Sequence, residues 1–261
     1  MSEKRNEDGG GGMRQVKQGW RTAMAVGALV AATAATAAMA APPDLTGVWT
    51  NAGRPGIGGA TRPTAPALPL KPDAAKRVKA YQDLVAKTGD SPGGLCLGTG
   101  MPGSMLGSGG YPMEIIQRPE QITIIYEAHS ETRRVYFGSR NAEQKDRIPG
   151  RNGYSSGRWE GDTLVVETDN LVDAVDQRST PHSDQATIVE RYTLEGKDEQ
   201  GRDILKAEMT MTDPVFYTAP VKMEKRWARV PNGRVLPYEC NEEMWTARLE
   251  ELAEKAGVPL P

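Results

Sequence analysis

The stretch MEIIQRPEQITIIYE, residues 113–127, decides the fold of this 261-residue chain. On both sides of Arg118-Pro119-Glu120, apolar and polar side chains alternate with the period of two that is typical of half-buried β-strands. The central tripeptide combines a proline with two charged residues, which suits a tight connection. We therefore predict a β-hairpin from strands Met113–Gln117 and Gln121–Glu127.

The same period continues through the chain. Further strands are expected at residues 45–51, 132–137, 156–159, 163–168, 187–194, 204–212, 222–230 and 236–239. So many antiparallel strands need a closed barrel or a sandwich, because open sheet edges attract other chains. The tripeptide Gly47-Val48-Trp49 on the first strand is typical of lipocalin-type barrels. With a hairpin-rich meander behind it, we favour an up-and-down barrel over a sandwich.

Two helices are expected beside the strands. The first begins at Pro72 and presents apolar residues at spacings of three and four up to Val85. The second begins with Asn241 as its N-cap and ends at Gly257. Its expected buried side chains are Trp245, Leu249, Leu252 and Ala256. The predicted fold is therefore mainly β: a single antiparallel lipocalin-like β-barrel with one helix on its N-terminal side and a C-terminal helix.

Residues 88–112 interrupt the periodic pattern with a long segment rich in Gly and Pro that also carries Met101 and Met105. A loop of this length in a small domain is usually functional. We interpret it as a mobile lid over a binding site.

Residues 1–40 have the pattern of a leader and signal peptide. Basic residues from Arg14 to Arg21 precede a short apolar run that ends at Ala38-Met39-Ala40, the A-x-A pattern of signal peptidase sites. A transmembrane helix is the alternative, although Ala and Thr insert weakly. We expect cleavage after Ala40, a barrel domain at residues 41–261, a periplasmic or secreted location and no stable membrane insertion afterwards. Translation could begin at Met1 or at Met13.

The composition excludes several classes of protein. The formal net charge is −2, whereas nucleic-acid binding requires a basic surface. Two histidines and two cysteines form no recognisable metal motif, and nothing in the sequence indicates a cofactor. In an exported chain the cysteines can oxidise, so we expect a Cys96–Cys240 disulfide, with two buried thiols as the alternative. The sequence leaves the oligomeric state open.

Six motifs resemble a family of exported, lipocalin-like bacterial proteins that mostly have no assigned function. They are DLTGVW at 44–49, CLGTGMP at 96–102, YPMEIIQ at 111–117, GRWEGDTLVVET at 157–168, PHSD at 181–184 and TDP at 212–214, which is followed by Tyr217. The resemblance implies a barrel fold and export. One position differs: members of the family carry Gly-His-Ser where this chain has Gly153-Tyr154-Ser155. Tyr154 is therefore a candidate catalytic residue in place of that histidine.

Glu190 is the first candidate for chemistry. The alternation of residues 187–194 places it on one face with Ile188, Tyr192 and Leu194. A carboxyl group among apolar neighbours could act as general acid or base. The alternative is a structural ion pair with an arginine such as Arg133 or Arg226.

The second group of candidates could hold a ligand. Arg133 and Arg134 are adjacent, so a strand sends them to opposite faces, and we expect one of them to point inward and bind a carboxylate or phenolate. The alternative is two solvated charges. Tyr126 shares a face with isoleucines and is expected in the core or pocket wall, whereas Tyr136 shares the face of Arg134.

His182 lies just before a strand, in a loop expected at the barrel rim, where it could exchange a proton or simply cap a turn. His129 is expected to be exposed in a turn. Although Ser183 and Asp184 follow His182, adjacent residues cannot form a catalytic triad by themselves.

Three functions are compatible with these residues. The first is a cofactor-independent lyase or decarboxylase that acts on a small aromatic, phenolic compound in the barrel, as other lipocalin-like barrels do. The second is a periplasmic carrier that binds a hydrophobic small molecule without changing it. The third is a structural protein whose barrel is filled with side chains. A pocket of roughly 300 Å³ or more with Glu190 facing inward would favour the enzyme, an apolar pocket the carrier, and a packed core the third function.

Overall fold

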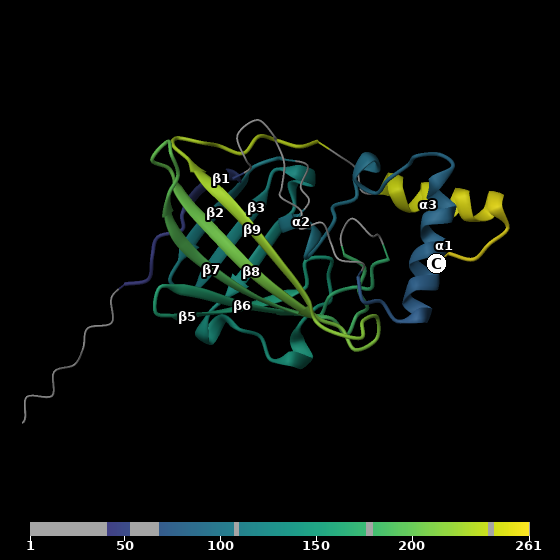
Figure 1. The fold of residues 1–261 in the computed structure, drawn as a ribbon, viewed down its shortest axis with the longest axis horizontal. Helices are drawn as coiled ribbons and strands as arrows, with labels where there is room; N and C mark the ends of the chain where they lie inside the picture. The colour runs from purple at the N-terminus through teal and green to yellow at the C-terminus, as the bar shows by residue number, and fades with distance from the viewer. Residues whose placement is uncertain (1–40, 53–67, 107–109, 176–179, 240–242, 261) are drawn as a thin grey trace, which may run out of the picture. The chain divides into compact units, whose positions relative to one another are not determined.

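A closed barrel of nine strands is formed by the part of the chain that the computed structural model describes, residues 41–52, 68–106, 110–175, 180–239 and 243–260 (Figure 1). The strands are β1 (Gly47–Asn51), β2 (Met113–Arg118), β3 (Gln121–Tyr126), β4 (Thr132–Tyr136), β5 (Tyr154–Glu160), β6 (Thr163–Asp169), β7 (Thr187–Lys197), β8 (Asp203–Thr212) and β9 (Val221–Val230). Each pairs with its neighbours in sequence, and β9 closes the barrel on β1. This confirms the mainly-β, lipocalin-like barrel. The expected leader, residues 1–40, lies outside the described residues.

The hairpin at residues 113–127 forms as predicted, from Met113 opposite Tyr126 to Arg118 opposite Gln121. The prediction of a strand at residues 236–239 is wrong, because these residues form neither a strand nor a helix. Both sides of β9 are already hydrogen-bonded, to β8 and to β1, so a closed barrel leaves this segment no edge to join. Instead, the backbone N–H of Leu236 donates to the Glu127 carboxylate at 2.7 Å.

One pair of strands departs from the antiparallel pattern. β4 and β5 run parallel and pair only at Val135 opposite Ser155 and Tyr136 opposite Ser156. A parallel pair cannot be joined by a tight turn and needs a crossover of roughly a dozen residues or more. Residues 137–153 supply it and contain two short 3-10 helices, η3 (Gly138–Arg140) and η4 (Gln144–Asp146).

Gly157 lets this sparse seam close. A Cβ atom at Gly157 would come within 2.7 Å of the Val135 side chain and 2.8 Å of the Phe137 ring. Contacts that short do not occur between carbon atoms, so only glycine allows β4 and β5 to approach. The glycine of the GRWEGD motif therefore has a packing role.

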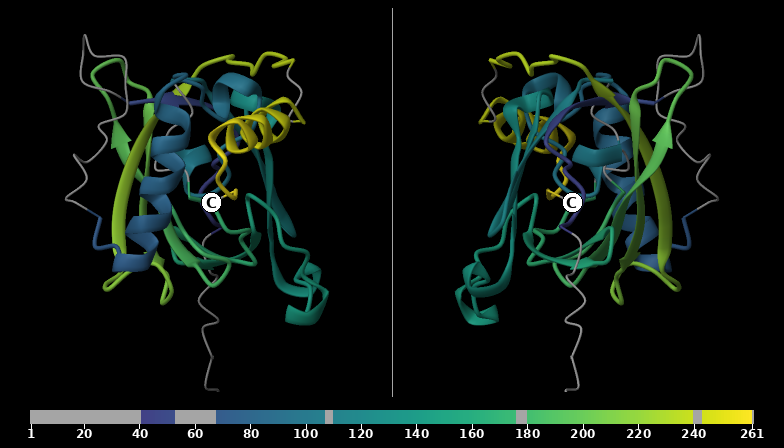
Figure 2. Two further views of the ribbon diagram at one scale, coloured as in Figure 1. Left: turned by 90° about the vertical axis from the view of Figure 1, so that its right-hand side faces the viewer. Right: turned by 90° about the vertical axis from the view of Figure 1, so that its left-hand side faces the viewer.

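Both predicted helices are present, as α1 (Pro72–Ala86) and α3 (Glu243–Ala256). They lie beside each other outside the barrel strands (Figures 1 and 2), with the rings of Tyr81 and Trp245 6.4 Å apart in an edge contact. Trp245 and Leu252 are buried as expected, but Ala256 is exposed in the last turn. The expected N-cap, Asn241, lies outside the described residues. None of the helices in the described ranges has the length and hydrophobicity of a membrane span.

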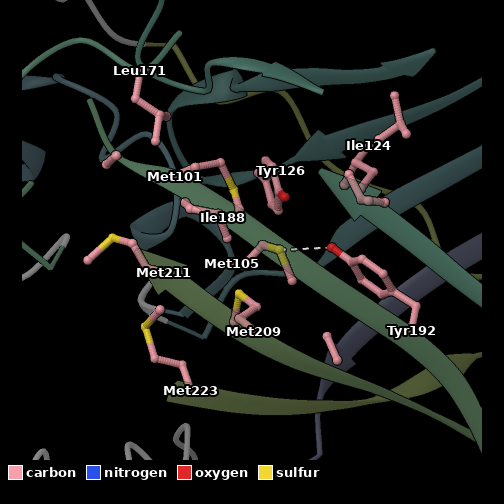
Figure 3. Packing of buried hydrophobic residues seen from close by; sticks show 14 of the residues in the cluster. Met101, Met105, Ile124, Tyr126, Leu171, Ile188, Tyr192, Met209, Met211 and Met223 are labelled. Atoms are coloured by element: carbon pink, nitrogen blue, oxygen red, sulfur yellow. Dashed lines mark hydrogen bonds between the residues drawn. The ribbon is translucent and has the colours of Figure 1, made fainter. Parts of the chain in front are cut away.

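The Gly- and Pro-rich segment enters the core instead of lying over it as a lid. It contains η1 (Gly93–Leu95) and α2 (Gly103–Leu106), and we call residues 97–106 the plug. Met101 and Met105 of the plug are fully buried. Figure 3 shows them facing Met209, Met211 and Met223 from β8 and β9. Flexible thioethers from three parts of the chain thus fill this part of the barrel.

Candidate functional site

Adjacent arginines on β4 lie on opposite sides of the barrel wall. Arg133 is 1% exposed and points inward, whereas Arg134 is exposed on the outer face. This settles which arginine faces the interior. The strand therefore separates the predicted site residues into an inner cluster around Arg133 and an outer pocket around Arg134.

In the inner cluster, the Arg133 side chain crosses the inner wall and finds a partner on each of the next three strands. Its Nε donates to Ser155 Oγ on β5 at 3.0 Å, and its Nη2 donates to Thr168 Oγ1 on β6 at 2.7 Å. Both terminal nitrogens bind the Glu190 carboxylate on β7, with Nη1 3.0 Å from Oε1. The remaining Nη1 contact is the Met105 sulfur at 3.5 Å. Glu190 and Arg133 therefore form a buried, bidentate ion pair. Such a pair was the alternative to a catalytic role for Glu190.

The charge of this pair is stabilised although both side chains are buried. Burial by itself would lower the pKa of Arg133, but the Glu190 carboxylate and its hydrogen bonds outweigh that effect and raise the pKa. Arg133 is thus permanently cationic, and Glu190 supplies its counter-charge within the barrel.

Two tyrosines complete the inner cluster. The Tyr192 hydroxyl lies 3.0 Å from Glu190 Oε1 and 2.9 Å from the Met105 sulfur, the contact drawn in Figure 3. The Tyr126 hydroxyl is buried and has no hydrogen-bond partner among the described residues. Burial, and to a smaller extent the Glu190 charge, raises the pKa of both tyrosines, so both hydroxyls keep their protons.

Leu194, at the far end of the β7 face that carries Glu190, is less buried than its place on that face predicts. Ile188, Glu190 and Tyr192 are buried, but Leu194 is 36% exposed. β7 extends to Lys197, so its last residues project past the part of the barrel that encloses side chains.

Buried polar contacts hold the plug in place. The Glu131 carboxylate accepts hydrogen bonds from the Gly100 backbone N–H at 3.0 Å and from Ser104 Oγ at 2.8 Å. The Met101 N–H donates to the Arg151 carbonyl at 3.0 Å. Gly100 has a φ of +67°, and a Cβ there would lie 2.4 Å from that carbonyl oxygen, so the plug requires glycine at this turn.

His182 also holds the plug, and the expectation of an accessible rim histidine is wrong. The side chain is 1% exposed, with Nε2 3.1 Å from the Met101 carbonyl and Nδ1 3.2 Å from the Ser183 carbonyl. Burial lowers the pKa of His182, although the two carbonyls oppose the shift. A neutral imidazole has one N–H, so only one of the two carbonyls can accept a hydrogen bond. His182 is therefore a structural contact of the plug, remote from solvent.

The neighbouring PHSD motif has a structural role as well. Ser183 donates from its N–H and its Oγ to the Asp213 carboxylate, at 2.7 and 2.9 Å. The same carboxylate accepts the backbone N–H groups of Val215 and Phe216. These hydrogen bonds outweigh the effect of burial and lower the pKa of Asp213. Asp213 thus ties the segment before β7 to the turn after β8, and Ser183 is not placed as a nucleophile.

The outer pocket lies between the outer face of β4 and the crossover to β5, with a volume of about 490 Å³. Its walls combine residues of β4 with residues from the crossover and the start of β5. The lining residues are Thr132, Arg133, Arg134, Tyr136, Arg140, Ala142, Asp146, Ile148, Asn152, Gly153 and Tyr154. Four predicted site residues thus line one cavity: Arg133, Arg134, Tyr136 and Tyr154.

The aromatic wall of the outer pocket is fixed in orientation. The rings of Tyr136 and Tyr154 stack with centroids 5.3 Å apart and planes at 26°. The Ala142 N–H donates to the Tyr154 hydroxyl oxygen at 2.6 Å, and the Arg147 guanidinium lies 4.6 Å from the Tyr154 ring centroid. Within the described part of the chain, the Tyr154 hydroxyl hydrogen has no acceptor, so it can serve a ligand.

The pocket lining contains two outward arginines, Arg134 and Arg140, which have few acidic partners. Arg134 forms no ion pair or hydrogen bond with any described residue. Arg140 has one looser ion pair, 3.6 Å from Glu120, with both side chains about half exposed. Asp146 supplies the acidic side chain in the lining. Among the outward side chains of the lining, Arg134 and Arg140 therefore exceed Asp146 by one charge.

Several site residues were missed by the sequence analysis. Ser155 and Thr168 occupy inward positions on their strands, so the alternation that singled out Glu190 would have identified them too. Arg140 and Ile148 lie in the crossover, which has no periodicity to follow. No sequence signal connects Met105 with Arg133, because their contact depends on the path of the plug.

The structure tests the expected exposure of His129 but not the expected Cys96–Cys240 disulfide. His129 is only half-buried, with a φ of 59°, and its ring packs on Tyr238 at 4.9 Å, so it is not simply exposed. Cys96 is described, but Cys240 lies outside the described residues, so the Cys96–Cys240 disulfide stays a prediction.

Comparison of the chain with models of known families, with curated proteins and with solved structures finds no match. The site must therefore be interpreted from its own geometry.

Proposed function

We propose that this protein is a binding protein for a small aromatic anion, such as a phenolate or an aromatic carboxylate, and that the outer pocket is its site. The observation that carries the proposal is Arg134, an arginine without a carboxylate partner among the described residues, on the rim of a cavity walled by stacked tyrosines. An unpaired guanidinium offers a bidentate fork to an oxyanion.

The size and walls of the pocket suit such a ligand. Its volume of about 490 Å³ lies within the range of roughly 300–1,000 Å³ that is usual for small-molecule sites. The Tyr136 ring and the Ile148 side chain provide apolar surface, while Arg134, Arg140 and the Tyr154 hydroxyl provide hydrogen-bond donors. A flat ring can contact the apolar surface while its oxyanion reaches the donors.

Binding is better supported than catalysis. Of the three predicted catalytic residues, Glu190 and His182 lie in the interior, where Glu190 is engaged by Arg133, and Tyr154 lines the outer pocket. Glu190 is 0% exposed, and its carboxylate also accepts from the Tyr192 hydroxyl at 3.0 Å. The lyase activity and the exported family therefore stay predictions, and the carrier, relocated to the outer pocket, is our proposal.

Titration with 4-hydroxybenzoate by isothermal calorimetry tests the proposal. We expect saturable binding that Arg134→Gln weakens at least about tenfold, the equivalent of about 1.4 kcal/mol. Arg234→Gln is the matched control, because Arg234 is an exposed arginine outside the pocket lining. Binding should weaken with salt, since exposed charges are screened.

The same samples distinguish a carrier from an enzyme. Chromatography of the ligand after prolonged incubation should recover it unchanged. Conversion to a decarboxylated product would favour the lyase, and equal affinity of Arg134→Gln and the parent would reject the outer pocket as the site.

Export is part of the proposal and rests on residues 1–40 of the sequence. N-terminal sequencing of the protein recovered from a native-like host should begin at Ala41. Retention of Arg14 in the mature chain would contradict cleavage.

A further inference from the structure

The Met105 sulfur occupies the one place in the inner cluster where strong hydrogen-bond donors converge on a weak acceptor. Arg133 Nη1 lies 3.5 Å from this sulfur and the Tyr192 hydroxyl 2.9 Å from it. A thioether accepts hydrogen bonds poorly, whereas guanidinium and phenol groups are strong donors. The single proton of Tyr192 already donates to Glu190 Oε1, so Arg133 Nη1 is the donor that an oxygen atom in the position of the sulfur would satisfy better.

A second observation points to the same place. The Tyr126 side chain is 1% exposed, and its hydroxyl proton has no acceptor among the described residues, because the neighbouring Arg133 can only donate. It lies against Arg133, whose charge acts on it, and Figure 3 shows it beside Met105. A buried hydroxyl without a partner is costly, so its presence calls for an acceptor.

The charges of the cluster select the kind of acceptor. Arg133 and Glu190 already neutralise each other within the barrel. An additional carboxylate or ammonium group would be an uncompensated charge in the interior, which is strongly unfavourable. A neutral oxygen acceptor satisfies the donors without adding charge, and the surrounding Met101 and Met209 side chains suit an apolar remainder.

We propose that the barrel interior contains a second binding site, independent of the outer pocket, which takes a small neutral carbonyl compound such as a ketone. The carbonyl oxygen accepts from Arg133 Nη1 and from the Tyr126 hydroxyl, and Met105 of the plug occupies its place in this structure. Binding displaces the Met105 side chain.

The variant Met105→Ala tests the site directly by removing the thioether. The probes are 2-butanone and 2-methyl-1-butene, which share one shape and differ in the carbonyl oxygen. A purely apolar cavity prefers the alkene, because an unpaired carbonyl is costly to remove from water. The proposal expects 2-butanone to bind more tightly than the alkene, measured by carbon-13 chemical shifts of the labelled probes.

The tyrosine donor is then removed. In Met105→Ala combined with Tyr126→Phe, we expect the ketone-to-alkene affinity ratio to fall at least about tenfold. Arg134→Gln should leave that ratio unchanged, which separates this site from the outer pocket. Tighter binding of the alkene to Met105→Ala, or binding of neither probe, would overturn the proposal.

The parent protein provides a test that does not depend on a core variant folding. In protein labelled at the methionine methyl groups, 2-butanone should shift the Met105 resonance, assigned with Met105→Leu, in a saturable manner. Met244 is the control, because it is 50% exposed on α3. If the Met105 resonance does not move, or moves only in parallel with Met244, the interior site is rejected.

Discussion

Arg133 and Arg134 are the same residue type at neighbouring positions on one strand, yet their surroundings differ completely. Arg133 is buried and makes hydrogen bonds to three strands, whereas Arg134 is exposed and unpaired among the described residues. The alternation of a β-strand produces this difference. Inside the barrel an arginine must have its partners supplied by the fold, while outside it water can solvate the charge until a ligand binds.

The role of a polar residue in a barrel wall therefore depends on its bonding partners as well as on the side of the strand that it occupies. An inward arginine was expected to bind a ligand, but Arg133 binds Glu190. An outward arginine is ordinarily solvated, but the crossover forms a cavity over Arg134.

The largest expected effect comes from breaking the inner pair. Glu190→Gln leaves a buried guanidinium without counter-charge and should lower the free energy of unfolding by about 3–5 kcal/mol. Arg134→Gln should stay within about 0.5 kcal/mol of the parent, because nothing in the described structure depends on that charge. Urea denaturation followed by circular dichroism measures both.

An apolar replacement of both partners sharpens this prediction. Arg133→Met combined with Glu190→Leu removes the charges together, so it should be more stable than Glu190→Gln by about 2 kcal/mol or more. A Glu190→Gln variant as stable as Arg134→Gln would show that the two faces of β4 do not differ energetically.

A smaller effect is expected at the plug, which closes the inner region. Glu131→Gln weakens the charge-assisted hydrogen bonds to Gly100 and Ser104 and should cost about 1.5–3 kcal/mol of unfolding free energy. Glu143→Gln is the matched control, since Glu143 forms an ion pair in which both side chains are 75% exposed. Equal stability of the two variants would mean that Glu131 does not hold the plug.

The smallest effect concerns pH. Because burial lowers the pKa of His182 below its ordinary value of 6.5, the unfolded chain takes up the proton first as the pH falls. The contribution of His182 to stability is complete above pH 6.5 and is lost below it, with a slope of at most about 1.4 kcal/mol per pH unit.

His182→Gln should remove this slope between pH 7 and pH 5, measured by urea denaturation at each pH. The lowered pKa of Asp213 has its effect only below its ordinary value of 3.8, so the two contributions fall in different ranges. An unchanged slope in His182→Gln would exclude the buried histidine as its source.

The sequence by itself predicted the strands of the barrel and both long helices, and it favoured a barrel over a sandwich, although it also predicted a strand at residues 236–239 that does not form. Period-two alternation located the strands of the barrel, and proline and glycine marked the ends of α1 and α3, because these signals act within a few neighbouring residues. Alternation also established that Arg133 and Arg134 face opposite sides, but not which of them faces inward.

The tertiary structure alone decided what those faces meet. Arg133 and Glu190 are separated by 57 positions in the chain, and Arg133 and Met105 by 28, so no local pattern relates them. The parallel pairing of β4 with β5 placed residues 137–153 over Arg134, and the plug placed Met105 against Arg133. Both placements depend on how the barrel closes, because only closure brings residues from distant strands to one wall.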